Sequence, residues 1–553
     1  MSGRRLPLLV AGFDAACWEY MTPWLQDGLL PNVQRLMAQG RFGVLHSTMP
    51  ALTPVAWSTL ATGANPGKHG VFEWNRLVRD ADPPHLQLHT SATVHGVPFW
   101  RQLNARGCGV GLVNIPLTFP TQPLDGFVLC GYPLIDPLRR YLYPPNLLPG
   151  LEAELGPYEP GHLEGMLANG EGWYAADERT QAFQVAAAIR LTAQLELDVL
   201  VINLMLPDHA NHLAPDMAGV QRAYADSDRH LGQLLDALQP LNVMLISDHG
   251  SRRIQGKFYI NQWLYDQGLL TWAPRTPTDP AGDLNWLLVQ AGQQAGLRGP
   301  LERVVRNGLR RALRAGNGPL PAWLARRLEQ LAPAAYRAYA FDGQADWGRS
   351  QFMSFGSLIY ANPAAAADAA ADVQARLLAL TDPGGKPVFQ AVLPAGQLYH
   401  GPQMAQAPAL ILDTFSSDWS LAFGPNYRSA SYFERGSGAW NGEHSRDGIF
   451  VFSGADFSPG ENMLAADLAD IPATVLYLMD AARPADYDGR VLQEFLAPAL
   501  LTQRPPSAQP TAATPAEKQG DPAAPPDADA SADLTPEQEA LMAQQLRALG
   551  YVD

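Results

Sequence analysis

Short apolar runs recur along the chain, and longer segments in which apolar positions follow a helical period separate them. Five runs of strand length cover Leu6 to Phe13, Val110 to Asn114, Asp198 to Asn203, Val243 to Ser247 and Gly448 to Phe452. Nearly continuous apolar strands that alternate with helices are typical of a parallel sheet buried on both faces. The pattern therefore predicts an α/β fold with a mostly parallel central sheet flanked by helices.

Acidic residues and a histidine stand where these runs end. Asp14 ends the first run, Asp208 follows the third closely, and Asp248 and His249 end the fourth. In open parallel sheets, ligands bind at the carboxyl ends of the strands. We therefore expect these side chains to gather at one edge of one sheet.

The spacing of Asp208 and His212 suits one metal ion, because residues four apart on a helix lie on the same face. His209 would point about 100° away from Asp208 on a helix, so His212 is the better candidate. Taken alone, the pair also fits an ordinary helix surface.

Asp248 and His249 are adjacent at a turn, where neighbouring side chains diverge and can address two different ions. His444 lies in a polar, glycine-containing loop that enters another strand, where a surface histidine is the plain alternative. With Asp14 and the preceding pair, these residues make three Asp and three His. That set suits zinc, with manganese or iron as alternatives, and two divalent ions could clamp a transferring phosphoryl group.

A nucleophile is expected where a hydroxyl can enter the shell of a metal, which lowers the pKa of the hydroxyl. The segment Met49 to Gly63 offers four hydroxyls, those of Thr53, Ser58, Thr59 and Thr62. Thr53 precedes a proline that suits the first turn of a helix, which predicts Thr53 as the N-cap, with the positive end of the helix facing a phosphate. An ordinary helix cap is the structural alternative.

Taken together, these residues resemble the alkaline phosphatase superfamily, and within it the type I phosphodiesterase and nucleotide pyrophosphatase branch. The matching segments, in family order, are the first strand with Asp14, Thr53 to Trp57 running into Thr62-Gly63, Asn65 to Gly70, Asp208-x-x-x-His212, Asp248 to Gly250, Ile260 to Leu264, Tyr399 to Pro402, Gly442 to His444, Asp470 to Thr474, and Asp488-Gly489. The resemblance spans nearly the whole chain to about Leu496.

The resemblance implies an alkaline phosphatase-like sheet with two metal sites. One ion would take Asp208, His212 and His444. The other would take Asp14, Asp248, His249 and the Thr53 oxygen. Thr53 would attack phosphorus in line and form a covalent intermediate, which water then releases.

Two departures from the family pattern keep alternatives open. Nucleotide pyrophosphatases of this branch usually carry Asn-His shortly after the proline that follows the nucleophile, where this chain has Ala56-Trp57, and their phosphoryl-holding asparagine has its nearest match in Asn75, one residue out of register. Asn75 could equally be a turn residue, and Lys68 a solvated one. A phosphomonoesterase or a phosphonate hydrolase of the same superfamily is therefore the alternative to a phosphodiesterase, and a catalytically silent binding relative is the non-enzyme alternative.

Two other branches of the superfamily fit less well. A sulfatase needs a modifiable cysteine in a Cys-x-Pro-x-Arg setting, and none of Cys17, Cys108 and Cys130 has one. A phosphoglycerate mutase would be expected to carry a serine nucleophile and a different inserted domain.

Composition divides the chain. Residues 1–274 and 342–500 are expected to form the catalytic core, and residues 275–341, which turn basic beyond Arg298, a helical cap insertion. Within the cap, Leu301 to Arg314 has the period of an amphipathic helix, whose arginines are either solvated or attract anionic substrate or a membrane surface. Residues 501–533 read as a disordered Ala/Pro-rich linker, and residues 534–553 as a short C-terminal helix with Thr535 as its N-cap.

Charge and cysteine usage restrict partners and compartment. The net charge of −15 argues against nucleic-acid polymers, which need a basic footprint, and favours a small-molecule phosphate ester as the partner. Three cysteines without paired spacing indicate a reducing compartment. No apolar stretch is long enough to span a membrane, and the short N-terminal run lacks a cleavage site, so a cytoplasmic protein is expected.

Overall fold

The computed structural model of the 553-residue chain divides into two compact units, which are described separately. It describes residues 5–78, 85–131, 139–160, 172–274, 287, 288, 290, 322–331, 336, 340–363, 365, 368–426, 429, 431–436, 442–505 and 534–549. The first unit takes Met1–Ile254, Leu393–Ser417 and Gly438–Val552, and the second takes Gln255–Val392 and Asp418–Ser437.

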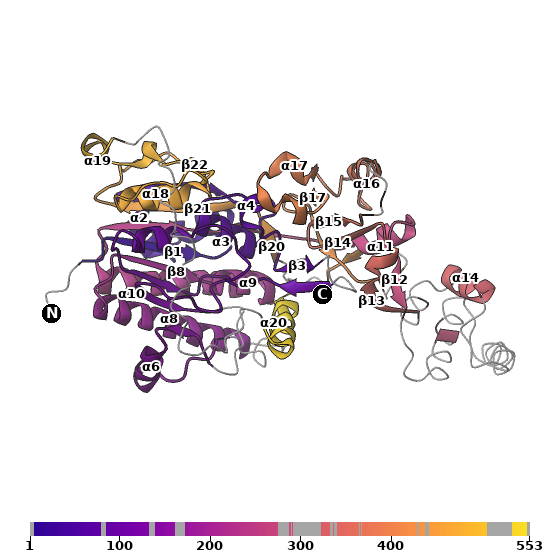
Figure 1. Cartoon of the computed structure of the whole chain (residues 1–553), viewed down its shortest axis with the longest axis horizontal. Coiled ribbons are helices and arrows are strands. Elements are labelled where there is room, and N and C mark those ends of the chain that lie inside the picture. The colour runs from indigo at the N-terminus through magenta and orange to yellow at the C-terminus, as the bar shows by residue number, and fades with distance from the viewer. Residues whose placement is uncertain are drawn as a thin grey trace. The chain divides into compact units, whose positions relative to one another are not determined.

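A nine-stranded, mostly parallel sheet forms the centre of the first unit (Figure 1). In spatial order its strands are β22 (Leu464–Asp467), β2 (Gly40–His46), β21 (Asp447–Gly454), β9 (Asn242–Ile246), β1 (Leu8–Phe13), β8 (Val199–Leu204), β5 (Val110–Val113), β6 (Gly126–Leu129) and β7 (Leu142–Tyr143). The five strands from β9 to β6 run parallel to one another. The predicted α/β fold is confirmed.

β21 runs antiparallel to its neighbours β2 and β9. The start of β21 therefore lies at the same edge of the sheet as the carboxyl ends of β9, β1 and β8. This direction brings the loop and short strand that precede β21 to the edge where the predicted acids gather.

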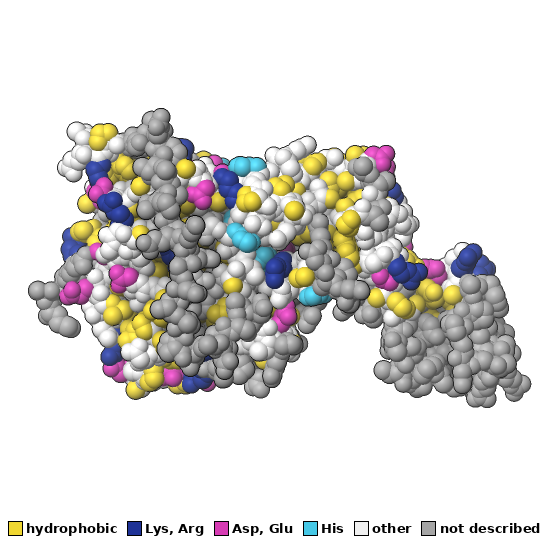
Figure 2. All heavy atoms as spheres, in the orientation of Figure 1, with side chains coloured by type: hydrophobic (Ala, Val, Ile, Leu, Met, Phe, Trp, Pro, Cys, Tyr) yellow, Lys and Arg dark blue, Asp and Glu magenta, His cyan; other side chains and the backbone are white. Residues whose placement is uncertain are grey.

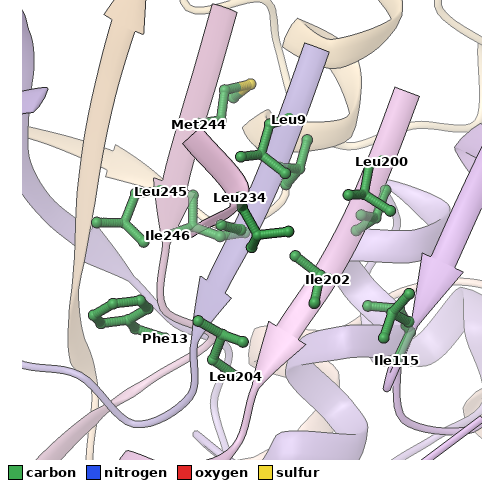
Figure 3. Packing of buried hydrophobic residues seen from close by; sticks show 14 of the residues in the cluster. Leu9, Phe13, Ile115, Leu200, Ile202, Leu204, Leu234, Met244, Leu245 and Ile246 are labelled. Carbon is green, nitrogen blue, oxygen red and sulfur yellow. The ribbon is translucent and has the colours of Figure 1, made fainter. Parts of the chain in front are cut away.

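The core lies where the central strands bury both faces. Leu9 of β1 and Leu200 and Ile202 of β8 lie on one face of the sheet, Met244 and Ile246 of β9 lie on the other, and all five are fully buried (Figure 3). Burial of such side chains stabilises the fold by about 1.5–3 kcal/mol each. A continuous apolar strand thus fixes the position of the polar residue that follows it.

Helices cover both faces of the sheet. α8 (Gly172–Gln194) and α10 (Met217–Leu238) lie along one face, and α3 (Thr53–Thr62) and α18 (Asp470–Leu478) along the other (Figure 1). The other described α-helices of this unit are α1 (Trp18–Gln26), α2 (Pro31–Gln39), α4 (Pro66–His69), α5 (Phe99–Asn104), α6 (Leu148–Leu155), α9 (Leu206–Leu213), α17 (Ala395–Leu398), α19 (Pro498–Gln503) and α20 (Pro536–Leu549). The unit also contains two antiparallel strand pairs, β3 (Asn75–Val78) with β4 (His85–Leu88) and β10 (Gly250–Arg253) with β20 (Gly442–Ser445), and the strand β17 (Leu410–Leu412).

The second unit is built on small sheets. β11 (Gly256–Tyr259) lies between β18 (Trp419–Ala422) and β19 (Phe433–Arg435), β12 (Trp272–Pro274) pairs with β13 (Phe341–Ala345), and β14 (Phe352–Phe355) pairs with β15 (Leu358–Ala361). Its described helices include α11 (Ile260–Asp266), α14 (Ala322–Leu331) and α16 (Ala369–Leu378). The predicted cap, residues 275–341, falls within this unit, and its predicted helix at 301–314 lies outside the described residues.

The C-terminal helix α20 packs on the first unit. Thr535 Oγ1 accepts the Gln538 N–H at 3.2 Å and the Gln538 side chain accepts the Thr535 N–H at 2.9 Å, a reciprocal capping arrangement. Leu546 is fully buried, and the helix contacts α9 and β4 (Figure 1). Residues 506–533 of the predicted linker lie outside the described residues.

The described surface in Figure 2 carries charges of both signs, and the cysteines form no disulfide. On the described part of the face in Figure 2, Lys and Arg side chains stand singly or in small groups among acidic and uncharged ones. All three cysteines are free thiols. Among the described residues, no helix is long and apolar enough to cross a membrane.

Candidate active site

Asp14 directly follows β1 and is fully buried at the carboxyl edge of the sheet. Its Oδ2 accepts hydrogen bonds from Asn203 Nδ2 at 2.6 Å and from Trp57 Nε1 at 3.3 Å. Its Oδ1 has no hydrogen-bond partner among the described residues. The two donors therefore fix the carboxylate and leave one oxygen directed at the rest of the cluster.

Asp248 and His249 follow β9, the strand beside β1, and both are fully buried. His249 Nε2 lies 3.3 Å from Asp248 Oδ2, 3.8 Å from Asp14 Oδ1 and 3.1 Å from Thr53 Oγ1. His249 Nδ1 lies 3.2 Å from the Gly250 carbonyl oxygen, which orients the ring. These atoms form a first group of potential ligands around the Thr53 hydroxyl.

A second group joins α9 to β20. Asp208 Oδ1 lies 3.4 Å from His212 Nε2 and 3.3 Å from His444 Nε2, and the two imidazole nitrogens are 2.9 Å apart. The other nitrogen of His444, Nδ1, lies 3.1 Å from the Ala51 carbonyl oxygen. Side chains four apart on α9 thus face a histidine that is more than 200 residues away in the sequence.

The two groups are contiguous. The His249 and His444 rings stack with their centroids 3.8 Å apart, and one set of mutually close donor atoms comprises Asp208, His249 and His444, while another comprises Asp14, Asp248 and His249. His212 Nε2 also lies close to Asp208 and His444 of the first set. His249 belongs to both sets and stands between two potential sites. Ligand atoms about 2.0 Å from a tetrahedral zinc lie roughly 3.3 Å apart, which the spacing around Asp208 matches. The donor set fits two divalent ions.

Burial sets the electrostatics of this cluster. Burial, with the nearby carboxylates of Asp248 and Asp208, raises the pKa of Asp14 well above its usual range, and burial and Asp208 raise the pKa of Asp248 to about 8. Burial would also raise the pKa of Asp208, but His212 and His444 outweigh it and hold that pKa well below the usual range. Three carboxylates removed from water demand compensating positive charge, which bound cations would supply.

Thr53 is buried and is the first residue of α3, whose N-cap is Leu52. The prediction of Thr53 as the N-cap is therefore wrong by one residue, because the extended backbone that precedes the helix extends only to Leu52. The hydrogen-bond partner of the Thr53 hydroxyl is His249 Nε2. The first amides of a helix carry partial positive charge, so this hydroxyl lies where an anionic phosphoryl group would be stabilised.

The other hydroxyls of this segment have different surroundings. Thr59 Oγ1 lies 3.0 Å from His69 Nε2, and Thr62 Oγ1 donates to the Ser58 carbonyl oxygen at 2.8 Å. Ser58 lines a cavity away from the ligand cluster. Thr53 is the one of the four that the described contacts join to a potential metal ligand.

His209, the rival of His212, turns away from the cluster. Its Nδ1 contacts the Asp177 carboxylate on α8. This contact agrees with the expectation that the side chains of His209 and Asp208 point in different directions from the helix. Buried in its own ion pair, His209 serves to hold α9 against α8.

Asn203 and Trp57 were not identified from the sequence, although both hold Asp14. Asn203 is a lone polar residue in the apolar run of β8, and this interruption is the signal that could have found it. A side chain added at Gly12 would collide with both, its Cβ lying 2.7 Å from Asn203 Oδ1 and 2.9 Å from the Trp57 ring. A glycine inside a buried strand marks such close approach.

Arg252, on β10, was also missed. Its Nε donates to the His444 carbonyl oxygen at 3.0 Å, and its two terminal nitrogens donate to the carbonyl oxygens of Ser417 and Thr414. One guanidinium thus ties the strand that carries His444 to a distant loop. A basic residue three positions after His249 gives no sequence signal of this backbone role.

Lys68 and Asn75 lie outside the ligand cluster. Lys68 Nζ donates to Asp488 and to the Asp486 carbonyl oxygen at 2.8 Å, so it ties the turn near α4 to a C-terminal loop and is not simply solvated. Asn75 is the first residue of β3, paired with Leu88, and is not a turn residue. No hydrogen bond among the described residues joins its side chain to the potential ligands.

Comparison with known proteins identifies the family of the chain. Residues 8–313, more than half of the chain, match the family model described as type I phosphodiesterase / nucleotide pyrophosphatase. No curated protein sequence matches the chain.

Two similar solved structures cover most of the chain. Phosphonoacetate hydrolase from Sinorhizobium meliloti 1021, in complex with phosphonoacetate, is 16% identical, with a TM-score of 0.54 over 86% of this chain and 96% of that chain. Murine ectonucleotide pyrophosphatase / phosphodiesterase 5, in an inactive form in complex with AMP, is 14% identical, with a TM-score of 0.49 over 89% of this chain and 100% of that chain. At 16% identity, the similarity to the phosphonoacetate hydrolase structure shows a shared fold.

Proposed function

We propose that this chain, which belongs to the type I phosphodiesterase / nucleotide pyrophosphatase family of phosphoester hydrolases, is a two-metal phosphodiesterase with Thr53 as its nucleophile. Three aspartates and three histidines would hold the ions: Asp14, Asp208, His212, Asp248, His249 and His444. The substrate would be a small phosphate ester, since the net charge of −15 disfavours a nucleic-acid polymer.

One observation carries the proposal. The Thr53 hydroxyl lies 3.1 Å from His249 Nε2, at the start of α3 and against two contiguous groups of buried ligand atoms. Thr53 is the first helical residue rather than the N-cap, so its hydroxyl is not engaged in capping and has a candidate metal ligand, His249, as its partner. The position supports a hydroxyl that reacts with a bound phosphoryl group.

When bound, two divalent ions would neutralise the phosphoryl oxygens, lower the pKa of the Thr53 hydroxyl and keep a water molecule ready for the second step. Zinc is the ion that the donor set favours, because mixed carboxylate and imidazole ligands are typical of it. Asp14 would be oriented for this task by Asn203 and Trp57. Outer partners of this kind fix ligand geometry in metal enzymes.

The chain's own residues define two steps. Thr53 Oγ1 gives up its proton to solvent and attacks phosphorus, so that the Oγ1–P bond forms as the bond to the leaving alcohol's oxygen breaks, and that oxygen takes a proton from solvent. Water then loses a proton and attacks phosphorus, the Oγ1–P bond breaks, and Thr53 Oγ1 takes up a proton, which restores the hydroxyl. The amides at the start of α3 stabilise the phosphoryl charge in both steps. Two successive inversions retain configuration at phosphorus.

A phosphomonoesterase or a phosphonate hydrolase is the second candidate. The indole of Trp57 is directed at Asp14, in the segment where the family usually carries Asn-His, so the chain lacks that pair beside Thr53. Because Ala56-Trp57 replaces the polar Asn-His pair, a substrate that is recognised without contacts to such a pair is favoured.

Turnover of matched esters tests the proposal. Purified protein is assayed with bis-p-nitrophenyl phosphate, p-nitrophenyl phosphate and phosphonoacetate, before and after chelation and after zinc is restored. A phosphodiesterase cleaves the diester fastest and loses this activity on chelation. Preference for the monoester or the phosphonate supports the second candidate. Absence of metal and of turnover with added zinc or manganese would sink both.

A further inference from the structure

A cavity of about 470 Å³ lies beside α3, within the first unit and lined by none of the potential metal ligands. Its size falls in the range of about 300–1,000 Å³ that is usual for small-molecule sites. Trp57 and Ala61, one helical turn apart, form its wall on α3. Trp57 therefore both lines the cavity and contacts Asp14 of the ligand cluster.

The body of the cavity is apolar. The indoles of Trp57 and Trp100 and the side chains of Leu112, Leu124 and Val128 contribute to its lining. These residues come from α3, α5, β5, β6 and the loop before β6. The apolar side chains of this wall favour a ligand with an apolar body.

Ser58 brings an unsatisfied hydroxyl to this lining, whereas the hydroxyls of Ser91 and Thr118, which also line the cavity, donate to backbone carbonyl oxygens. Ser58 is 3% exposed, and its Oγ has no hydrogen-bond partner among the described residues. A buried hydroxyl without a partner costs about 1–3 kcal/mol. Because Ser58 lines the cavity, a hydrogen-bonding group on a bound molecule would satisfy it.

The rim of the cavity is cationic. Arg101 is exposed and donates to Gln122 Oε1 at 2.6 Å, and both residues line the cavity. No carboxylate pairs with Arg101 in the described part of the chain. An uncompensated guanidinium at the mouth of an apolar cavity matches an anionic head group.

We propose that this cavity binds an anionic amphiphile, a carboxylate whose apolar body carries one hydroxyl or carbonyl group. The head group contacts Arg101, the body lies between Trp57 and Trp100, and its polar group pairs with Ser58. The site does not depend on the proposed catalytic function, because no residue of that function except Trp57 lines it.

Displacement of 1-anilinonaphthalene-8-sulfonate by dodecanoate and by a positional series of hydroxydodecanoates tests the site on the full-length protein. One saturable site is expected. Ala92→Trp, at an exposed position of the lining, should abolish binding, whereas Ala105→Trp, exposed but outside the lining, should not. Arg101→Gln should weaken binding roughly fivefold, as expected for an exposed ion pair. Arg106→Gln, also exposed, is its matched control.

The hydroxyl series tests Ser58. At least one hydroxydodecanoate should bind roughly fivefold more tightly than dodecanoate, the value of about one net hydrogen bond. Ser58→Ala should remove that advantage without weakening dodecanoate. Equal binding of the whole series to both proteins would overturn the assignment of Ser58.

A separate readout locates the ligand without any activity measurement. In protein labelled with 5-fluorotryptophan, dodecanoate should shift the ¹⁹F resonances of Trp57 and Trp100, identified with the Trp57→Phe and Trp100→Phe variants. The resonance of Trp18, outside the lining, should stay in place. Unsaturable binding, or binding that Ala92→Trp leaves unchanged in a folded protein, would overturn the proposal.

Discussion

Trp57 donates its indole Nε1–H to Asp14 Oδ2 across 3.3 Å, one helical turn after Thr53 on α3. The helix that presents the proposed nucleophile therefore also orients a proposed metal ligand. This contact couples the position of α3 to that of β1, with Asn203 as the second donor to the same oxygen.

Replacing the indole N–H should weaken metal binding without unfolding the protein. Trp57→Phe keeps an aromatic ring in the core but leaves Asp14 with one donor. Loss of an outer partner typically costs about 10- to 100-fold in metal affinity or activity. We expect zinc affinity to fall within that range, as measured by competition with a chromophoric chelator.

Trp18→Phe is the matched control, because Trp18 also donates its indole N–H, to the Gly43 carbonyl oxygen at 2.7 Å, but does so away from the ligand cluster. Its zinc affinity should equal that of the wild type. An equal loss in both variants would show that the effect belongs to the fold and not to Asp14.

Much of this arrangement follows from local sequence patterns. Continuous apolar runs specify buried parallel strands, and the residue after each run must lie at the carboxyl edge, which places Asp14 and Asp248. The i and i+4 spacing places His212 beside Asp208 once α9 forms. These inferences need only the side-chain periodicities of strands and helices.

Other features depend on how distant segments meet. His444 reaches the cluster because β21 is antiparallel to β9, a pairing that no local pattern specifies. The partners of Arg252 lie more than 160 residues away, and the cavity beside Trp57 needs five elements to close it. The N-cap of α3 is Leu52 and not the predicted Thr53, because a proline marks a helix start only to within its first turn.

Arg252 should govern the occupancy of one metal site. Arg252→Met removes the donors that hold the His444 carbonyl oxygen and the loop at Thr414, so β20 should lose its fixed position. We expect zinc content, measured by inductively coupled plasma mass spectrometry, to fall from two ions per chain toward one. Arg253→Met, at the exposed neighbouring position, should retain two. Full occupancy in Arg252→Met would contradict this positioning role.

Direct removal of a ligand should have the larger effect on the same site. His444→Ala and Asp208→Ala should each lower both zinc content and turnover, because the remaining donors cannot complete the site. His400→Ala, an exposed histidine that contacts Asp488, is the control and should keep both. Unchanged zinc content in the two ligand variants would break the proposed grouping.

Chelation should destabilise the folded protein. Removal of the ions leaves buried carboxylates without compensating charge, and a ligand present at 100 times its Kd stabilises by about 2.7 kcal/mol. We expect Tm to fall on chelation and to recover when zinc is added at two equivalents per chain. Scanning calorimetry checks this, and a Tm that does not respond to zinc would exclude a bound-metal role for the cluster.

The C-terminal helix should be held by Leu546. Leu546→Ala removes a fully buried side chain from α20, at a cost of about 2–5 kcal/mol, which should release the helix from β4. The Leu88 N–H, which donates to Glu539 Oε1 at 3.0 Å, should then exchange with solvent roughly 30-fold faster or more. Gln544→Ala, at an exposed position, should leave exchange unchanged, and the opposite order of the two variants would contradict this packing.

The central claim is that Thr53 is the nucleophile of a two-metal site, and the most direct test is turnover of bis-p-nitrophenyl phosphate by Thr53→Ala with its zinc content measured on the same sample. The carboxylate and imidazole ligands remain, so zinc should stay near two ions per chain while kcat falls by about three orders of magnitude or more. Thr53→Ser should recover part of the rate. Wild-type turnover in Thr53→Ala with both ions bound would place the nucleophile elsewhere and contradict the account.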